Sequence, residues 1–162
     1  MVQIAIQILI NLFVAFIWMF FQDDWSSLSF VSGYFVGLVV TFSIRRFFKR
    51  PYYVFMIIAL GKLFIIFIKE TISSSILVLK QVLRPKINVT PGIFKLETSL
   101  EGDLEVTLLA MLITLTPGSV VMEITPDSKV FYIHAMDIPE SRDAVFKSQK
   151  VFEKAIKDVT RK

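Results

Sequence analysis

The chain of 162 residues contains no cysteine and only one histidine, His134. The lack of cysteine excludes disulfides and thiolate-ligated metals, and a single histidine cannot form a histidine cluster around a metal ion. Charge is also missing over a long stretch, because no ionisable side chain occurs from residue 1 to residue 22. We therefore expect no catalytic site, no metal and no cofactor, and we expect a membrane-embedded start.

Two apolar runs approach the length that crosses a bilayer. The first covers residues 2–21 and is followed by Asp23 and Asp24, while the second covers residues 28–44. A hydrocarbon core about 30 Å thick requires roughly 20 apolar residues of helix. The N-terminus has neither a basic region nor a small-residue cleavage site, so the first run is typical of a retained helix. The sequence predicts a transmembrane helical hairpin over residues 1–50.

Polar or small side chains recur at every fourth position of both runs. The first run carries three amides and the second carries small residues: Gln3, Gln7, Asn11, Ser29, Gly33, Gly37 and Thr41. Such a spacing places side chains on one helix face, where small residues allow close approach and amides require polar partners. We expect both stripes to be helix-packing surfaces, against each other or against another chain. The alternative for the outer amides is a position at headgroup depth.

A basic cluster follows the second run, at Arg45, Arg46, Lys49 and Arg50. Lys and Arg accumulate on the cytoplasmic side of membrane proteins, and acidic residues contribute little to orientation. The end of the second helix and the N-terminus are therefore expected in the cytoplasm. These patterns together predict a multi-pass protein of the cell (plasma) membrane.

Residues 51–85 form a third apolar segment that is interrupted by charge. On a helical wheel its basic residues Lys62, Lys69, Lys80 and Arg84 fall within roughly 60° of one another. A long helix with one cationic stripe and a broad apolar face is typical of the membrane surface. We expect an interfacial helix whose stripe, with the preceding basic cluster, binds the anionic lipids of the cytoplasmic leaflet.

A third transmembrane span is the alternative for this segment. It would bury Lys62 and the Lys69-Glu70 pair in the membrane and would leave the rest of the chain outside the cell. Charges at that depth are functional by default, so the three residues would then be candidates for an ion path.

Residues 86–162 have the composition of a small folded domain. Residues 1–91 carry a net charge of +6, from nine basic and three acidic residues, whereas residues 92–162 carry −2, from nine basic and eleven acidic residues. No basic patch with interleaved aromatic residues is present, so we expect no nucleic-acid binding. Acids at Glu101, Asp103 and Glu105 suit the first turn of a helix, whose dipole they complement.

The periodicity of this tail predicts the element order β-α-β-β-α. Alternation over residues 93–98 indicates a strand, and a helix with Asp103 as N-cap follows. Its apolar residues recur with helical spacing, at Leu104, Leu108, Met111, Leu112 and Leu115. Residues 119–124 and 129–135 indicate two strands joined by a turn, and Pro139 starts the last helix. This order is typical of a split βαβ unit with a final helix covering the sheet. With the first two strands parallel through a right-handed crossover, we expect a three-stranded mixed sheet in a small cytoplasmic α+β domain.

Four short stretches of the tail resemble one family. They are Pro91-Gly92-Ile93-Phe94, Leu104-Glu105-Val106-Thr107-Leu108-Leu109-Ala110, Ile113-Thr114-Leu115-Thr116-Pro117-Gly118 and Tyr132-Ile133-His134-Ala135-Met136-Asp137. They are similar to the E subunit of the bacterial multisubunit Na+/H+ antiporter of the Mrp or Mnh type. The resemblance covers essentially the whole chain, including its length and the apolar hairpin.

The resemblance implies a small accessory subunit, not an enzyme, whose larger partner subunits carry the ion-translocating charges. We therefore expect the chain to support assembly and stability of the complex. The alternative is a stand-alone lipid-binding membrane anchor with a small regulatory domain, recruited by the cationic stripe of residues 51–85.

Overall fold

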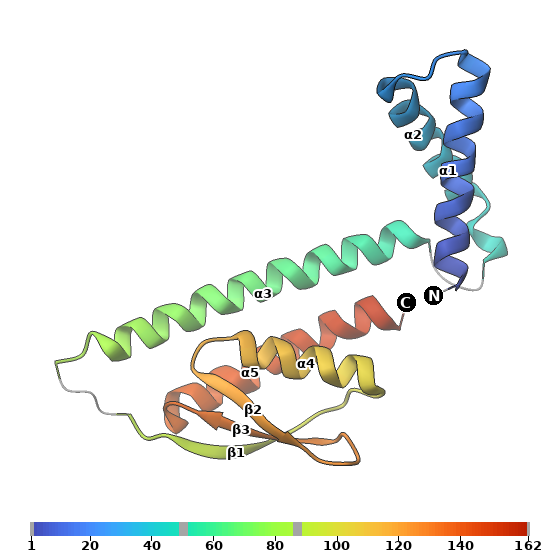
Figure 1. The fold of residues 1–162 in the computed structure, drawn as a ribbon. Helices are drawn as coiled ribbons and strands as arrows, with labels where there is room; N and C mark the ends of the chain where they lie inside the picture. The colour runs from blue at the N-terminus through green and yellow to red at the C-terminus, as the bar shows by residue number, and fades with distance from the viewer. Residues whose placement is uncertain (1, 49–51, 86–88, 162) are drawn as a thin grey trace. The chain divides into compact units, whose positions relative to one another are not determined.

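The computed structural model describes residues 2–48, 52–85 and 89–161 and divides into two compact units. The first unit ends at Ile58 and the second begins at Ala59. The domain limits expected at residues 50 and 86 fall outside the described residues. Figure 1 shows a helical first unit and a mixed helix-and-sheet second unit.

The first unit is a helical hairpin followed by the start of a long helix. Helix α1 covers Val2–Gln22, α2 covers Ser27–Ser43, a short 3-10 turn covers Arg45–Phe47, and α3 runs over Tyr53–Val82 into the second unit. The turn between α1 and α2 is built on Asp24, whose carboxylate accepts hydrogen bonds from the backbone N–H and the hydroxyl of Ser26 at 3.0 and 2.8 Å. Ser26 Oγ in turn accepts from the N–H of Ser29 and caps α2.

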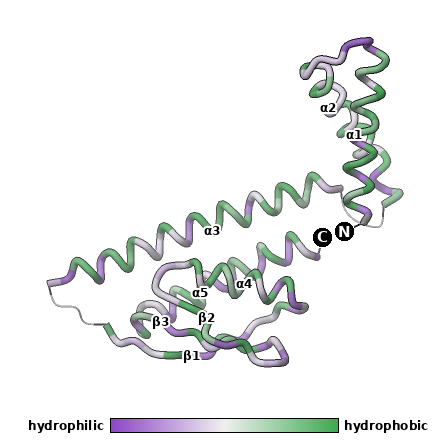
Figure 2. The backbone as a smooth tube through the Cα atoms, viewed as in Figure 1, coloured by the Kyte–Doolittle hydropathy of each residue, from purple (hydrophilic) through white to green (hydrophobic). Residues whose placement is uncertain are grey.

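Helix α1 is the one described helix that meets the length and composition of a membrane span, over Gln3–Gln22 with a mean hydropathy of 2.4. Helix α2 is apolar but has 17 residues, at the short limit for crossing a bilayer. Figure 2 shows that apolar residues dominate both helices and are interrupted mainly at their ends and at isolated positions.

The sheet of the second unit is antiparallel throughout, so the expected mixed sheet is wrong. Strand β1 covers Gly92–Glu97, β2 covers Ser119–Ile124 and β3 covers Val130–Ala135, in the order β1-β3-β2. Both β1 and β2 pair with β3 in antiparallel register. They therefore run parallel to each other, as the split βαβ unit predicts, but β3 separates them and no parallel ladder forms. The physical reason is that β3, tied to β2 by a tight turn, fills the space that the β1–α4–β2 connection leaves between its two strands.

Helices α4, over Asp103–Leu115, and α5, over Ile138–Thr160, cover one face of this sheet, and α3 lies over them (Figure 1). Inward residues of β1 and β3, among them Leu96, Phe131 and Ile133, pack against Leu109 of α4 and Phe152 of α5. Burying five such side chains contributes roughly 1.5–3 kcal/mol each before the entropy of ordering is subtracted. Helix α3 adds Leu63 to the same core.

The N-cap of α4 is Gly102, so the expectation of Asp103 is wrong. Gly102 has a φ of 81°, a conformation that glycine adopts at little cost. Asp103 instead lies in the first helical turn, and no side chain caps this end. The backbone N–H of Glu101 donates a hydrogen bond to the carboxylate of Glu105, which lies in α4, at 3.1 Å.

Candidate functional site

Two of the three amides of α1 lie inside the hairpin. Gln7 and Asn11 are fully buried, and Gln3 is half-buried. Gln7 Oε1 accepts from the backbone N–H of Tyr53 at 2.9 Å, and Asn11 Nδ2 donates to the Tyr53 hydroxyl at 2.6 Å. The hydroxyl of Tyr34 lies 3.1 Å from that of Tyr53. The stripe therefore binds the start of α3, a partner within the chain that the sequence reasoning did not identify.

The small residues of α2 face α1. Ser29, Gly33, Gly37 and Thr41 are all buried, and the Thr41 hydroxyl donates to the carbonyl of Gly37 at 2.7 Å. A β-carbon added at Gly33 would lie 2.8 Å from Trp18 Cβ. A β-carbon added at Gly37 would collide with Asn11 Oδ1. The Asn11 side chain fits here because Gly37 has no side chain of its own.

The basic residues that the sequence predicts at the membrane surface are exposed wherever the structure describes them. Arg45 and Arg46 are in the 3-10 turn, where each guanidinium lies over a phenylalanine ring. Lys49 and Arg50 lie outside the described residues. The remaining four are also exposed: Lys62, Lys69 and Lys80 on α3, and Arg84 just beyond its end.

In the second unit α3 has three distinct faces. One face packs onto the domain through Leu63, Ile66 and Phe67. The basic stripe lies beside it. The third face is apolar and exposed, and comprises Phe64, Ile65, Ile68, Ile72, Ile76 and Leu79. The sequence pattern alone could not separate the two apolar faces, because both carry Leu, Ile and Phe.

Polar contacts also hold α3 on the second unit. Glu70, a candidate for an ion path in the three-span alternative, accepts a hydrogen bond from the Ser148 hydroxyl of α5. Near the end of α3, Gln81 Nε2 donates to Asp137 Oδ2 at 3.2 Å. Asp137 Oδ1 also accepts from the backbone N–H of Thr90 at 3.3 Å. Periodicity could not reveal these contacts, since they join residues more than 40 positions apart.

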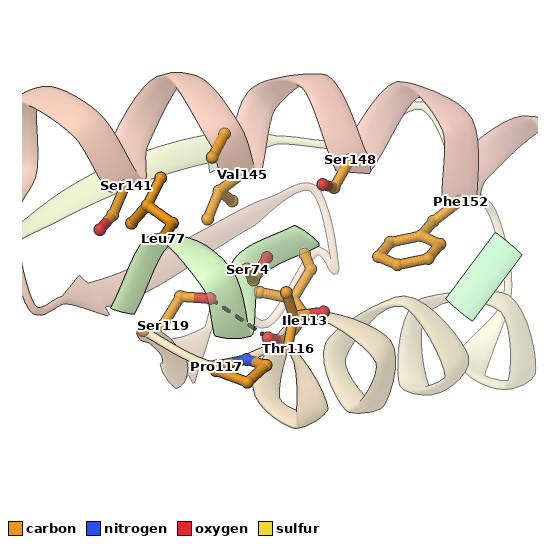
Figure 3. Close-up of a pocket in the computed structure, with 12 residues that line it drawn as sticks. Ser74, Leu77, Ile113, Thr116, Pro117, Ser119, Ser141, Val145, Ser148 and Phe152 are labelled. Atoms are coloured by element: carbon orange, nitrogen blue, oxygen red, sulfur yellow. Dashed lines mark hydrogen bonds between the residues drawn. The ribbon is translucent and has the colours of Figure 1, made fainter. Parts of the chain in front are cut away.

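A small cavity lies where α3, the end of α4 and α5 meet (Figure 3). Hydroxyl-bearing residues line part of it: Ser74, Thr116, Ser119, Ser141 and Ser148. Its volume of about 20 Å³ accommodates about one water molecule and excludes a larger ligand. Ser119 donates to the carbonyl of Ile113, the bond drawn dashed in Figure 3, whereas Ser141 Oγ is buried without a hydrogen-bond partner among the described residues.

An ion pair joins α4 to the end of α5 in the second unit. Arg161 Nε and Nη2 donate to the two carboxylate oxygens of Glu105 at 2.9 and 2.7 Å, and the Thr160 hydroxyl adds a third bond at 2.6 Å. These bonds, led by that from Arg161, lower the pKa of the buried Glu105 carboxyl from 4.5 to about 2, although burial opposes the shift. The sequence reasoning assigned Glu105 only to the helix dipole and missed this pair.

A second carboxylate fastens the segment that follows β1 to α5. Glu153 accepts hydrogen bonds from the hydroxyls of Thr98 and Ser99 at 2.7 and 2.6 Å and from Gln149 Nε2 at 2.8 Å. Burial opposes ionisation, but these bonds outweigh it and lower the pKa of Glu153. Among residues 2–48, 52–85 and 89–161 no three side chains of His, Asp or Glu gather as a metal site would require. His134 is half-buried on β3.

Comparison with known proteins identifies close relatives of the whole chain. A family model described as "Na+/H+ ion antiporter subunit" matches residues 11–159. The E subunit of the Na(+)/H(+) antiporter of Bacillus subtilis is 48% identical over 157 residues, which are 97% of this chain and 99% of the relative. The protein of the same name from Alkalihalophilus pseudofirmus is 43% identical over 157 residues, with the same coverage.

Two solved structures contain similar chains. A chain of the membrane-bound sulfane sulfur reductase, an archaeal respiratory membrane complex, matches with a TM-score of 0.55 and 22% identity, over 94% of this chain and 98% of that one. This likeness shows a shared fold. A chain of the Mrp complex from a Dietzia species matches with a TM-score of 0.45 and 26% identity, over 64% of this chain and 96% of that one.

Proposed function

Because the chain belongs to the family of Na+/H+ antiporter E subunits, we propose that it is an accessory membrane subunit of a multisubunit Na+/H+ antiporter. In this role it supports the assembly and stability of the complex, while larger subunits carry the ion path. We assign it no enzymatic step and no cofactor. Its partners are the other subunits of the antiporter and the lipids of the cell membrane.

The observation that supports this proposal most strongly is the composition of the hairpin interior. The sequences of α1 and α2 contain no charged residue, and the fully buried amides Gln7 and Asn11 bind Tyr53 of the same chain. Ion pathways in membranes depend on ionisable groups that face a bundle interior or a water-filled cavity. A hairpin of this kind offers contact surfaces to neighbours and lacks the groups that would move a cation or a proton.

We propose that α1 and α2 both cross the membrane and that α3 lies at the cytoplasmic surface. The exposed apolar face of α3 suits the boundary between acyl chains and headgroups, and Lys62, Lys69 and Lys80 beside it suit anionic lipids. The domain of residues 89–161 packs on the opposite side of α3, which is consistent with a cytoplasmic position.

The alternative is a stand-alone lipid-binding anchor with a small regulatory domain. The cationic stripe and apolar face of α3 favour it, since this pairing needs only a lipid surface as partner. Purification from membranes in mild detergent separates the two functions. An accessory subunit co-elutes with large multi-span partners, whereas an anchor elutes alone or as a homodimer.

We propose that the domain of the second unit braces the complex on the cytoplasmic side, and deletion of residues 92–162 tests this role directly. The shortened chain keeps α1, α2 and α3, and we expect it to lower the yield of intact complex and the Na+/H+ exchange of membrane vesicles. The Glu97→Gln variant is the matched control, because this exposed carboxylate forms no part of the contacts described above. Unchanged yield and exchange after the deletion would show that the domain braces nothing.

A further inference from the structure

An apolar stripe on α4 is largely exposed. Leu104, Met111 and Leu115 of α4 are 67%, 56% and 61% exposed, and Leu108 between them is half-buried. Val106, Leu109 and Ile113 on the other face of α4 are buried in the core, and Leu108 packs against its edge. We call Leu104, Leu108, Met111 and Leu115 the α4 ridge.

A groove runs beside this ridge, between α4 and the edge strand β2. Its volume is about 570 Å³. Four residues of each element line it: Ala110, Met111, Thr114 and Leu115 from α4, and Val121, Met122, Glu123 and Ile124 from β2. Ala110 and Thr114 are small, so they leave the floor of the groove open to a side chain from outside.

The geometry favours a helix as the occupant over an added strand. The ridge residues are spaced by four, three and four positions, the spacing with which one helix packs along another. The edge of β2 is poorly suited to strand addition, because a bulge between Val121 and Glu123 breaks its register and the Val121 N–H donates to Thr114 Oγ1 at 3.3 Å. The bulge leaves Met122 62% exposed over the groove.

The lining also restricts the chemistry of the occupant. Glu123 is its only charged residue, and its carboxylate has no hydrogen bond or ion pair within the part of the chain that the structure describes. Met111 and Met122 provide flexible, polarisable surface that adapts to an apolar partner. An apolar helix with one basic side chain opposite Glu123 complements both features.

We infer that the groove between α4 and β2 receives an apolar helix of a neighbouring antiporter subunit, with a Lys or Arg of that helix paired to Glu123. The inference rests on the proposed function, since it requires a complex with other subunits. It goes further by assigning the contact to one face of the domain, distinct from α1, α2 and the exposed face of α3.

Charge substitutions in the assembled antiporter test this contact. The test variants are the double substitution Met111→Glu with Leu115→Glu, and Glu123→Lys. Ile93→Glu and Glu97→Lys are matched controls, because both residues are exposed on β1, away from the groove. Circular dichroism and amide exchange of α4 establish that each variant folds. We expect the test variants to lower co-purification of the other subunits at least about tenfold, an effect of about 1.4 kcal/mol, and the controls to change it less than about twofold.

Crosslinking identifies the occupant. The chain has no native cysteine, so Met122→Cys in the assembled complex gives a single site for a benzophenone probe. Crosslinking to an apolar helix of another subunit supports the inference. Crosslinking to a second copy, to lipid alone or to nothing overturns it. If the deletion of residues 92–162 lowers complex yield while the groove variants do not, only this inference fails; if the deletion has no effect, the proposed function fails.

Discussion

Gly37 of α2 determines how closely the hairpin can pack. A β-carbon at this position would clash with Asn11 Oδ1 and would lie 2.8 Å from the Asn11 carbonyl oxygen. We predict that Gly37→Ala displaces the Asn11 amide, breaks its bond to Tyr53 and costs roughly 1–3 kcal/mol. Thermal unfolding of the chain in mild detergent measures the loss.

Gly61 provides a matched control within α3. A β-carbon there has nothing within 4 Å, so Gly61→Ala should be neutral or should stabilise the helix by up to about 1 kcal/mol. Equal effects of the two substitutions would contradict the close packing of α1 on α2.

Glu105 makes the second unit sensitive to acid. Its pKa is lowered from 4.5 in the unfolded chain to about 2 in the folded chain, so ionised Glu105 stabilises the fold above pH 4.5. This stability is lost as the pH falls from about 4.5 toward 2, because the unfolded chain then binds a proton that the folded chain does not. We predict that Glu105→Gln removes this pH dependence and costs roughly 1.5–3 kcal/mol near neutral pH.

Amide exchange of α4 and α5 between pH 2 and pH 7 measures the effect of Glu105. The exposed Glu97→Gln variant is the control and should keep the acid-dependent loss of protection seen in the unsubstituted chain. Identical pH profiles for Glu105→Gln and the unsubstituted chain would exclude a stabilising role for the Arg161 pair.

At the scale of elements, α3 is predicted to lie at the membrane surface. Single spin labels at Ile72→Cys, on the exposed apolar face, and at Lys69→Cys, on the basic stripe, report depth in a bilayer. We expect the label at Ile72 to be accessible to oxygen and the label at Lys69 to a water-soluble nickel chelate. A label at the exposed Asp143→Cys on α5 provides the aqueous reference.

The spin-label experiment also decides between two and three spans. Equal depth for the labels at Lys69 and Ile72 would favour a third transmembrane span, and the same aqueous accessibility at Ile72 and Asp143 would remove α3 from the membrane altogether.

The positions of helices and strands were largely predictable from the sequence. The pairing of the strands and the choice of the buried helix face were not. The period of two in residues 93–98 locates β1 within one residue, because alternation reports burial on one sheet face. It does not report which strands pair, so a mixed sheet was expected although both pairings with β3 are antiparallel.

The sequence also did not reveal which face of a helix is buried or which residues form long-range polar contacts. The residues of the α4 ridge recur with clear helical spacing, and the sequence therefore suggested that they form the buried face. In the structure Val106, Leu109 and Ile113 form the buried face instead. The partners of Gln7 and Glu105 lie 46 and 56 residues away, at Tyr53 and Arg161, beyond any local pattern. Spacing in the chain could identify the packing stripe of α1 but could not identify the residue that completes it.

At the scale of the whole molecule, the position of the domain relative to the membrane is the first prediction. Ser128 lies in the turn between β2 and β3, so Ser128→Cys offers a unique thiol for labelling. With two spans the domain is cytoplasmic, and a membrane-impermeant reagent should label it only after the cells are opened. Labelling at full rate on intact cells would contradict the two-span arrangement.

We propose that this chain contributes contact surfaces and that other subunits carry the ions. Reconstitution of the purified chain alone into vesicles with an imposed proton gradient tests it most directly, with the complete antiporter as the positive control. We predict no Na+ movement above that of protein-free vesicles for the chain alone and full exchange for the complex. Sodium uptake driven by the gradient through the chain alone would contradict it.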